Sequence, residues 1–312
     1  MAANIYPPPP PLAPWHSQFQ SHLSQIPNPK TFSFSTVSQG VNGRPVPRVR
    51  TCVFRNFWAE VNLNDSAREE LLRSEREGEG KGSNAAAGGG VVVVGEESRG
   101  LNPRKFESDL LTFTTDARMD KVRQVSSSNE NSVAAAGGCG GPVEALFWFK
   151  EVMAQWRFRG TAFIIGANSS EESEMEARGE IGKWMRKREG GSVMFDDGDD
   201  GAAKTWTWER EITAQFANMS PIMRGSFKHP PPGTPVSAPV PDPSLGFGQK
   251  VTDLYDPLAR SHFRVVVIVP EEVEMVDLSN PEEGKRRKWT FVAAKEDDGR
   301  KRGEWEVVEL WP

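Results

Sequence analysis

The sequence is poor in cysteine, and the two that it has stand far apart. Cys52 lies in an apolar run and Cys139 in a glycine cluster, a spacing typical of neither a disulfide framework nor a metal site. We therefore expect two free or buried thiols in a reducing compartment, and no bound metal.

Long apolar runs and an excess of positive charge are missing as well. No segment has the roughly 18 to 20 uncharged apolar residues that a membrane span needs, and the N-terminus lacks the basic and apolar regions of a secretory signal. Lysine and arginine number 38 against 43 acidic residues, a net charge of −5, which does not favour nucleic-acid binding. We expect a cytoplasmic protein without membrane or nucleic-acid partners, in which any phosphate site is local.

Four segments differ sharply in composition from the rest of the chain. They are rich in glycine, serine, proline or acidic residues and hold too little patterned apolar surface to offset the entropy lost on ordering. We expect them to be insertions or loops within one domain that spans residues 1–312. The predicted disordered insertions are 76–100, 126–142 and 167–204, and the predicted Pro/Gly-rich loop is 228–250.

The remaining segments have the apolar spacing of strands and of a few helices. Apolar residues four apart predict a helix over 15–25, and a second helix is predicted over 208–227, where Pro221 should break or restart it. The predicted strands are 31–38, 47–57, 110–115, 143–152, 156–165, 263–269, 272–278, 288–293 and 304–310. Many strands with few helices predict a mainly β, α+β fold, built as a closed or nearly closed antiparallel barrel.

Two arginines stand on one predicted strand, in the run Arg-Thr-Cys-Val-Phe-Arg from residue 50 to 55. Since successive side chains of a strand point to opposite faces, Arg50, Cys52 and Phe54 should share one face and Arg55 the other. Charged residues are also common on exposed edge strands that bind no ligand. The strand alone therefore leaves both interpretations open.

Two further segments carry hydrogen-bonding groups. Residues 115–121, Thr-Asp-Ala-Arg-Met-Asp-Lys, join a strand to a predicted helix start, where hydroxyls, backbone N–H groups and cations converge as in a phosphate site. Their aspartates equally suit the cap of a surface helix. Gln155 opens the strand Gln-Trp-Arg-Phe-Arg-Gly, a position at which glutamine is usually solvated.

Taken in order, these three segments resemble the pyridoxamine 5'-phosphate oxidase-like family of FMN-binding split barrels, especially its uncharacterised fungal and bacterial branch. Residues 50–55 are similar to the family's Arg-x-x-x-x-Lys strand, and 115–121 to its Thr-Asp-x-Arg-Ser-x-Lys turn. Residues 155–160 are similar to its Gln-x-Arg-x-x-Gly strand. The run 219–235 and the closing segment 305–312 are also typical of the family.

The resemblance implies a homodimer with FMN at the subunit interface. Arg50 and Lys121 would hold the FMN phosphate, Gln155 would reach the flavin from the partner subunit, and Arg286 would approach the pyrimidine side of the ring. Arg55 is also the first candidate for a substrate phosphate. The residues that the resemblance assigns to the cofactor are Arg50, Thr51, Cys52, Val53, Arg55, Thr115, Arg118, Lys121, Gln155 and Arg286.

The sequence departs from the family mainly on the substrate side. Met119 replaces a serine of the family's turn, and residues 282–285, Glu-Glu-Gly-Lys, stand where pyridoxamine 5'-phosphate oxidases have Arg-x-His. The acidic segment 167–204 lies where a substrate-binding Tyr, Arg and Ser set is expected. We therefore expect an FMN-dependent oxidoreductase of unknown substrate, with no catalytic residue identified. The alternatives are a non-catalytic flavin- or cofactor-binding module and a structural interaction protein that binds no flavin.

Overall fold

The structure is a computed structural model that describes residues 9–79, 100–127, 140–166, 172–188, 205–280, 282–294 and 303–312. The valine run 91–94, for which we expected a loop, lies outside them. The strands are β1 Thr31–Gln39, β2 Pro45–Val53, β3 Phe106–Glu107, β4 Leu111–Asp116, β5 Gly141–Phe149, β6 Ala154–Ile165, β7 Arg186–Lys187, β8 Phe263–Asp277, β9 Lys285–Ala293 and β10 Gly303–Leu310.

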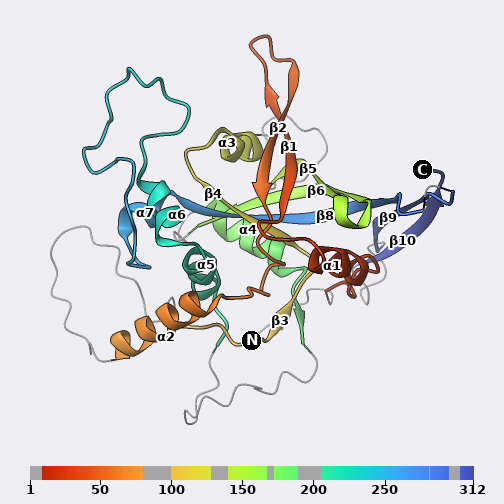
Figure 1. Cartoon of the computed structure of the whole chain (residues 1–312), viewed down its shortest axis with the longest axis horizontal. Helices are drawn as coiled ribbons and strands as arrows, with labels where there is room; N and C mark the ends of the chain where they lie inside the picture. The colour runs from red at the N-terminus through yellow and green to blue at the C-terminus, as the bar shows by residue number, and fades with distance from the viewer. Residues whose placement is uncertain are drawn as a thin grey trace.

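The helices surround the main sheet and connect its strands (Figure 1). The α-helices are α1 His16–Ser24, α2 Asp65–Glu79, α3 Asp120–Ser127, α4 Glu172–Gly182, α5 Trp208–Ala217, α6 Pro221–Gly225 and α7 Pro257–His262, and short 3-10 helices are η2 Lys150–Val152 and η3 Ser226–Lys228. None of the helices in the described ranges has the length and the apolar composition that a membrane span requires.

The main sheet closes on itself as a split barrel, which confirms the predicted fold class. Its strands follow the order β10-β9-β8-β6-β5-β1-β2, and β4 pairs with the first half of β8. The ring closes where Arg55 N–H donates to the carbonyl of Thr112 at 2.9 Å, and Thr112 N–H to that of Asn56 at 3.0 Å. Strand β9 pairs with the second half of β8, so β9 and β10 extend away from the closed ring.

Aromatic side chains fill the barrel, and helix α1 contributes one of them. Phe19 is fully buried, and its ring centroid lies 4.7 Å from that of Phe158 and 5.2 Å from that of Phe147. Trp15 and Leu23 are buried on the same helical face, as their four-residue spacing predicted. Burial of such large apolar side chains stabilises the attachment of α1 to the barrel.

A second apolar cluster lies on the outer side of the first half of β8. Ile212 and Phe216 of helix α5 are fully buried in it, and Phe216 lies 5.1 Å from the ring of Phe263 at the start of β8. Figure 1 shows α3 and α5 on opposite sides of β8. Helix α5 therefore fixes the segment that follows it, which forms part of the cavity described below.

The restart of the helix at Pro221 is confirmed. Helix α5 ends at Ala217, and α6 begins at Pro221 with Ser220 as its cap, because the Ser220 hydroxyl accepts a hydrogen bond from Met223 N–H at 3.3 Å. Proline suits the first helical position, where its missing N–H would have had no helical partner.

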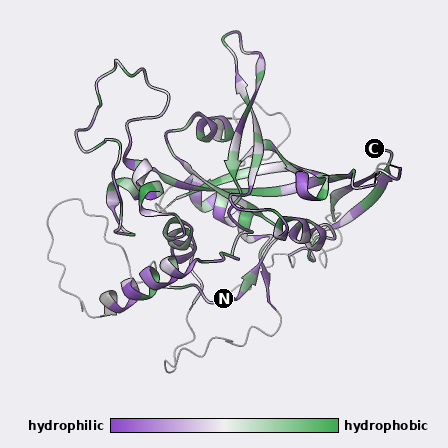
Figure 2. Ribbon diagram, in the orientation of Figure 1, coloured by the Kyte–Doolittle hydropathy of each residue, from purple (hydrophilic) through white to green (hydrophobic). Residues whose placement is uncertain are grey.

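Three parts of the structure differ from the sequence expectations. Segment 167–204 contains helix α4, whose Ala177 and Ile181 are buried, together with strand β7. Helix α2 reaches into the segment 76–100, and in Figure 2 it shows both hydrophilic and hydrophobic residues. Strand β8 is continuous where two strands were expected, because a register shift between Arg159 and Gly160 accommodates the extra residue of β8.

Candidate functional site

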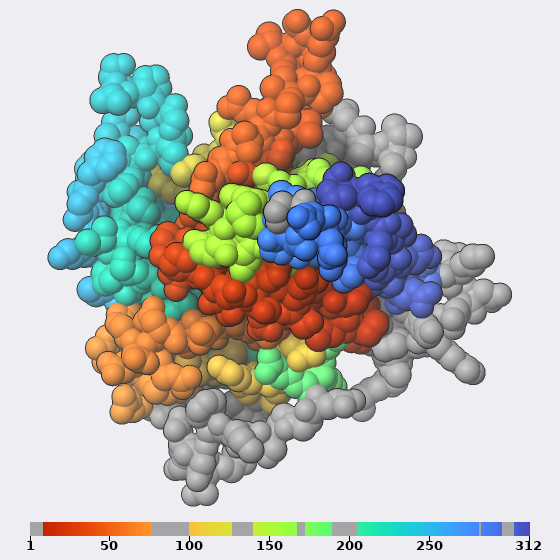
Figure 3. Space-filling model, turned by 45° about the vertical axis from the view of Figure 1, so that its right-hand side comes forward, coloured from red at the N-terminus to blue at the C-terminus, as the bar shows by residue number. Residues whose placement is uncertain are grey.

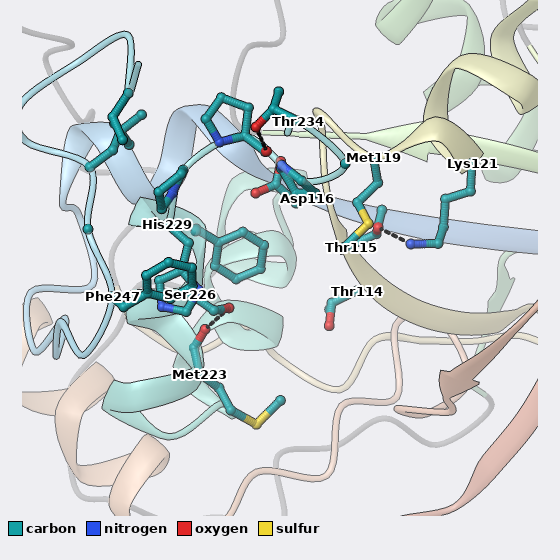
Figure 4. Close-up of a pocket in the computed structure, with 18 of the residues that line it drawn as sticks. Thr114, Thr115, Asp116, Met119, Lys121, Met223, Ser226, His229, Thr234 and Phe247 are labelled. Atoms are coloured by element: carbon teal, nitrogen blue, oxygen red, sulfur yellow. Dashed lines mark hydrogen bonds between the residues drawn. The ribbon is translucent and has the colours of Figure 1, made fainter. Parts of the chain in front are cut away.

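A cavity of about 1000 Å³ lies between the end of β2, the end of β4 and the segment after α5. Figure 4 shows Thr115 and Lys121 at one end of it, and His229 and Phe247 at the other. One side is lined by 51–53, Arg55, 114–116, Met119 and Lys121. The other side is lined by Met219, Met223, Ser226, Phe227, 229–236, 238–241 and 245–247.

The wall formed by the end of β2 contains the predicted residues Thr51, Cys52, Val53 and Arg55. Arg55 Nε donates to the Thr114 hydroxyl at 3.2 Å, and burial lowers the pKa of its guanidinium. Burial also raises the pKa of the Cys52 thiol to about 11. The thiol is therefore neutral at neutral pH and unsuited to act as a nucleophile.

Helix α3 brings Lys121 to the polar end of the cavity. Its ammonium group donates to the Thr115 hydroxyl at 3.1 Å, as Figure 4 shows. Burial first, and then the nearby Arg50 guanidinium, lower the pKa of Lys121. Two cations that repel each other in a partly buried site favour the binding of an anion between them.

Arg50 lies beside a second cavity of about 560 Å³, which shares Met119, Lys121, Pro232 and Gly233 with the first. Its guanidinium donates to the Thr36 hydroxyl at 2.7 Å and to the Gln124 side-chain oxygen at 2.6 Å. These partners are neutral, so they orient the guanidinium without forming an ion pair with it. They lie 14 and 74 residues away in the chain, so the motif alone did not reveal them.

Within the described ranges, Arg50, Arg55 and Lys121 form no salt bridge with a carboxylate. Cations close together, with a hydroxyl among them, supply the donors that a phosphate group requires. The residues present therefore fit the phosphate of FMN, and the neighbouring cavity has the space for its ring.

Arg118, a predicted phosphate residue, has other partners in this protomer. It binds the Asp116 carboxylate at 2.6 Å and donates to the backbone carbonyls of His229 at 3.0 Å and Phe227 at 3.3 Å. Arg118 thus joins the turn before α3 to the opposite wall of the cavity. Its predicted role as a phosphate ligand stays a prediction.

Gln155 and Arg286 lie outside the cavity lining of this protomer. They flank Val276 in the register of β6, β8 and β9, so the three side chains share one face of the sheet. Arg286 donates to Glu274 at 2.9 Å. Both residues therefore meet an FMN site only if that site belongs to a second subunit, as the resemblance implies.

The sequence did not reveal that segment 219–247 forms half of the cavity. Residues 219–227 were predicted as the end of a helix and 228–250 as a Pro/Gly-rich loop, and Figure 1 shows the part after η3 as a long loop projecting from the domain. The fold brings it to β4 through His262, the last residue of α7. The His262 carbonyl oxygen accepts a hydrogen bond from Ala117 N–H at 2.7 Å, and the Nδ1 atom of its ring lies 2.7 Å from the carbonyl oxygen of Phe227. These contacts join residues that are far apart in the chain, so no local sequence pattern indicates them.

Comparison with known proteins places the first half of the chain in one family. Residues 12–166 match "Pyridoxamine 5'-phosphate oxidase, FMN-binding domain". The uncharacterized protein YGR017W of Saccharomyces cerevisiae is 21% identical over 96% of this chain and 99% of its own length. A pyridoxamine 5'-phosphate oxidase-related, FMN binding protein of Nostoc punctiforme is 18% identical, with a TM-score of 0.52 over 97% of this chain and 100% of that chain. This last likeness shows a shared fold.

Proposed function

Residues 12–166 belong to the FMN-binding domain family of the pyridoxamine 5'-phosphate oxidases, and we propose that the chain is an FMN-dependent oxidoreductase acting as a homodimer. FMN is the cofactor of this domain family. The assignment of FMN to this site rests on Arg50 and Lys121, two cations that line one cavity. Both cations border the same space, and in the described part of the chain neither is bridged to a carboxylate.

The FMN phosphate lies between Arg50 and Lys121 in this proposal. Arg50 supplies a forked pair of donors, Lys121 a compact charge, and Thr115 a hydroxyl already within 3.1 Å of the lysine. An anion with roughly two negative charges offsets the repulsion that lowers the pKa of Lys121. Arg118 supports the phosphate from the following turn, where it is fixed by Asp116.

The flavin ring lies along the end of β2 in this proposal. Thr51, Cys52 and Val53 border it with backbone and short side chains, and Arg55 meets its edge beside Thr114. When bound, FMN supplies the group that accepts or donates a hydride. The residues of the chain position that group and keep water from one of its faces.

The second subunit completes the site in this proposal through a row of residues on the outer face of the sheet. The register places Trp148, Gln155, Val276, Arg286 and Leu310 side by side across β5, β6, β8, β9 and β10. Trp148 and Leu310 are exposed although both are large and apolar. Exposed apolar residues beside polar ones are typical of an interface, and Gln155 and Arg286 would then reach the partner's FMN. Location in the cytoplasm stays a prediction.

Replacing both cations tests the cofactor site. The Arg50→Ala, Lys121→Ala double variant should lose FMN while its far-ultraviolet circular dichroism spectrum stays unchanged. Each charge-assisted hydrogen bond contributes about 1.5–3 kcal/mol, so the dissociation constant of FMN should rise by at least about a hundredfold.

A matched control is available on the same helix. Arg123 of α3 is exposed and paired with Asp120 at 2.6 Å, so Arg123→Ala removes a cation near the site without removing a phosphate donor. It should retain FMN. Unchanged flavin content in the double variant would rule out this phosphate site. Tight FMN binding without any redox turnover would instead favour a non-catalytic cofactor-binding module.

A further inference from the structure

Building on the proposed FMN site, we propose that the end of the cavity formed by segment 219–247 binds an uncharged, largely apolar ring compound as the second substrate. A phosphorylated substrate such as those that define the family name would not bind there. The composition, the ion pairs and the position of this wall all favour an uncharged, largely apolar compound beside the flavin.

The volume of the cavity is at the upper end of the range for ligand-binding pockets. Ligand-binding pockets commonly enclose roughly 300–1,000 Å³, and this one reaches about 1000 Å³. Its two ends differ in chemistry. The end near Thr115 and Lys121 carries the hydroxyls and cations assigned to FMN, whereas the end near Phe247 is formed by segment 219–247 (Figure 4).

The apolar end presents exposed carbon surface to the cavity. Its lining includes two methionines, two phenylalanines, prolines and valines, all from segment 219–247. Val236 is fully exposed and the Phe247 side chain is 80% exposed. The Phe247 ring lies 4.7 Å from that of His229, so it is positioned as one side of a ring-binding slot. A hydrophobic ligand would remove this surface from water.

The one arginine and the one lysine of segment 219–247 are both ion-paired. Arg224 forms a two-point ion pair with Glu70, with contacts of 2.8 and 3.1 Å. Lys228 is bound to Asp256 at 3.0 Å. A phosphate group at this end would therefore lose hydration without gaining an unpaired arginine or lysine from this segment, which is unfavourable. Arg55 lies at the other end, beside Thr114.

The wall is a closed loop with a fixed base. Gly246 N–H donates to the carbonyl of Lys228 at 2.8 Å, and Val251 N–H donates to that of Pro221 at 3.0 Å. Frequent proline restricts the conformations of the intervening chain. Figure 3 shows this loop and the β1–β2 hairpin as two projecting arms with a hollow between them. The loop thus holds its apolar residues over the cavity at a low cost in entropy on binding.

Two probes with the same ring test the inference directly. 1-Naphthol and 1-naphthyl phosphate differ by the phosphate group alone, and their affinities for the FMN-loaded protein can be measured by isothermal titration calorimetry. Occupation of the Arg50–Lys121 site by FMN prevents the phosphate probe from binding there. We expect 1-naphthol to bind at least tenfold more tightly, and equal affinities or a preference for the phosphate would overturn the inference.

Variants of exposed residues show where the probe binds. Phe247→Ser should weaken 1-naphthol binding by roughly threefold to tenfold, the size of one aromatic contact. Val41→Ser is the control, since Val41 is as fully exposed as Val236 but lies in the turn between β1 and β2, away from the cavity lining. Val236→Arg adds a free cation to the wall and should tighten 1-naphthyl phosphate binding by roughly tenfold.

The FMN content of each protein, measured by absorbance, separates the two proposals. Normal FMN content with no loss of 1-naphthol affinity in Phe247→Ser would refute the apolar substrate end and leave the FMN site standing. A wild-type protein that cannot bind FMN would refute the proposed function itself. In that case binding of 1-naphthol to the FMN-free protein, reduced by Phe247→Ser, would still support the apolar end.

Discussion

Removing one member of the Arg224–Glu70 ion pair tests how the cavity wall is fixed to helix α2. The two nitrogens of the guanidinium meet the two carboxylate oxygens at 2.8 and 3.1 Å. The side chain of Arg224 is 1% exposed and that of Glu70 is 16% exposed. The pair is thus largely desolvated, and its Coulomb attraction must offset the hydration that both charges lose.

The two single substitutions should lower the free energy of unfolding by different amounts. Glu70→Leu leaves a guanidinium that stays charged and has almost no access to water, so it should lower the free energy of unfolding by about 3–5 kcal/mol. The Arg224 guanidinium carbon lies 5.9 Å from the centroid of the Phe216 ring, so Arg224→Met places an apolar side chain beside that ring. It leaves a carboxylate that can reach water or a proton, so its cost should be smaller, about 2 kcal/mol. The double variant should lie within about 1 kcal/mol of the wild type, since neither charge remains.

Urea unfolding followed by circular dichroism measures these differences, and coincident transitions by tryptophan fluorescence check that unfolding is two-state. A double variant whose loss equals the sum of the two single losses would show that the charges are not coupled. Equal losses in the two single variants would contradict the argument from unequal burial.

Two other predictions concern titration and assembly. Burial raises the pKa of Glu211 to about 7 from 4.5, so the stability that its neutral form contributes is full below about pH 4.5 and is lost as pH rises through 7. Glu211→Gln should therefore gain up to about 3 kcal/mol over the wild type between pH 5 and pH 8 in urea unfolding, and an identical pH dependence in both proteins would contradict this. The Trp148→Glu, Leu310→Glu double variant should sediment as a monomer with reduced FMN content, whereas Met175→Glu, also at an exposed apolar residue, should remain a dimer. A wild-type monomer that holds FMN would refute the proposed interface.

The barrel could be predicted because the apolar residues of its strands follow a recognisable pattern in the sequence. Alternating apolar residues identified β1 almost to its ends, and the spacing of Trp15, Phe19 and Leu23 identified α1. Helix α4 was missed because its segment is dominated by acidic residues and glycine, and only its packing buries Ala177 and Ile181. Such tertiary contacts decide the structure of weakly patterned segments.

The site could be predicted only in part. The spacing of the motifs grouped Arg50, Arg55 and Lys121, and the structure brings them to adjoining cavities. The contacts of Arg118 with the carbonyls of Phe227 and His229 span 109 and 111 residues, and no local pattern encodes them. For the same reason the opposite wall of the cavity was recognised as a loop but not as part of the site.

The most direct test of the central claim is the absorbance spectrum of the purified protein, with the released cofactor identified by mass. The account predicts a flavin band and the mass of FMN, and both should disappear in the Arg50→Ala, Lys121→Ala variant. A colourless wild-type protein that cannot be reconstituted with added FMN would contradict it.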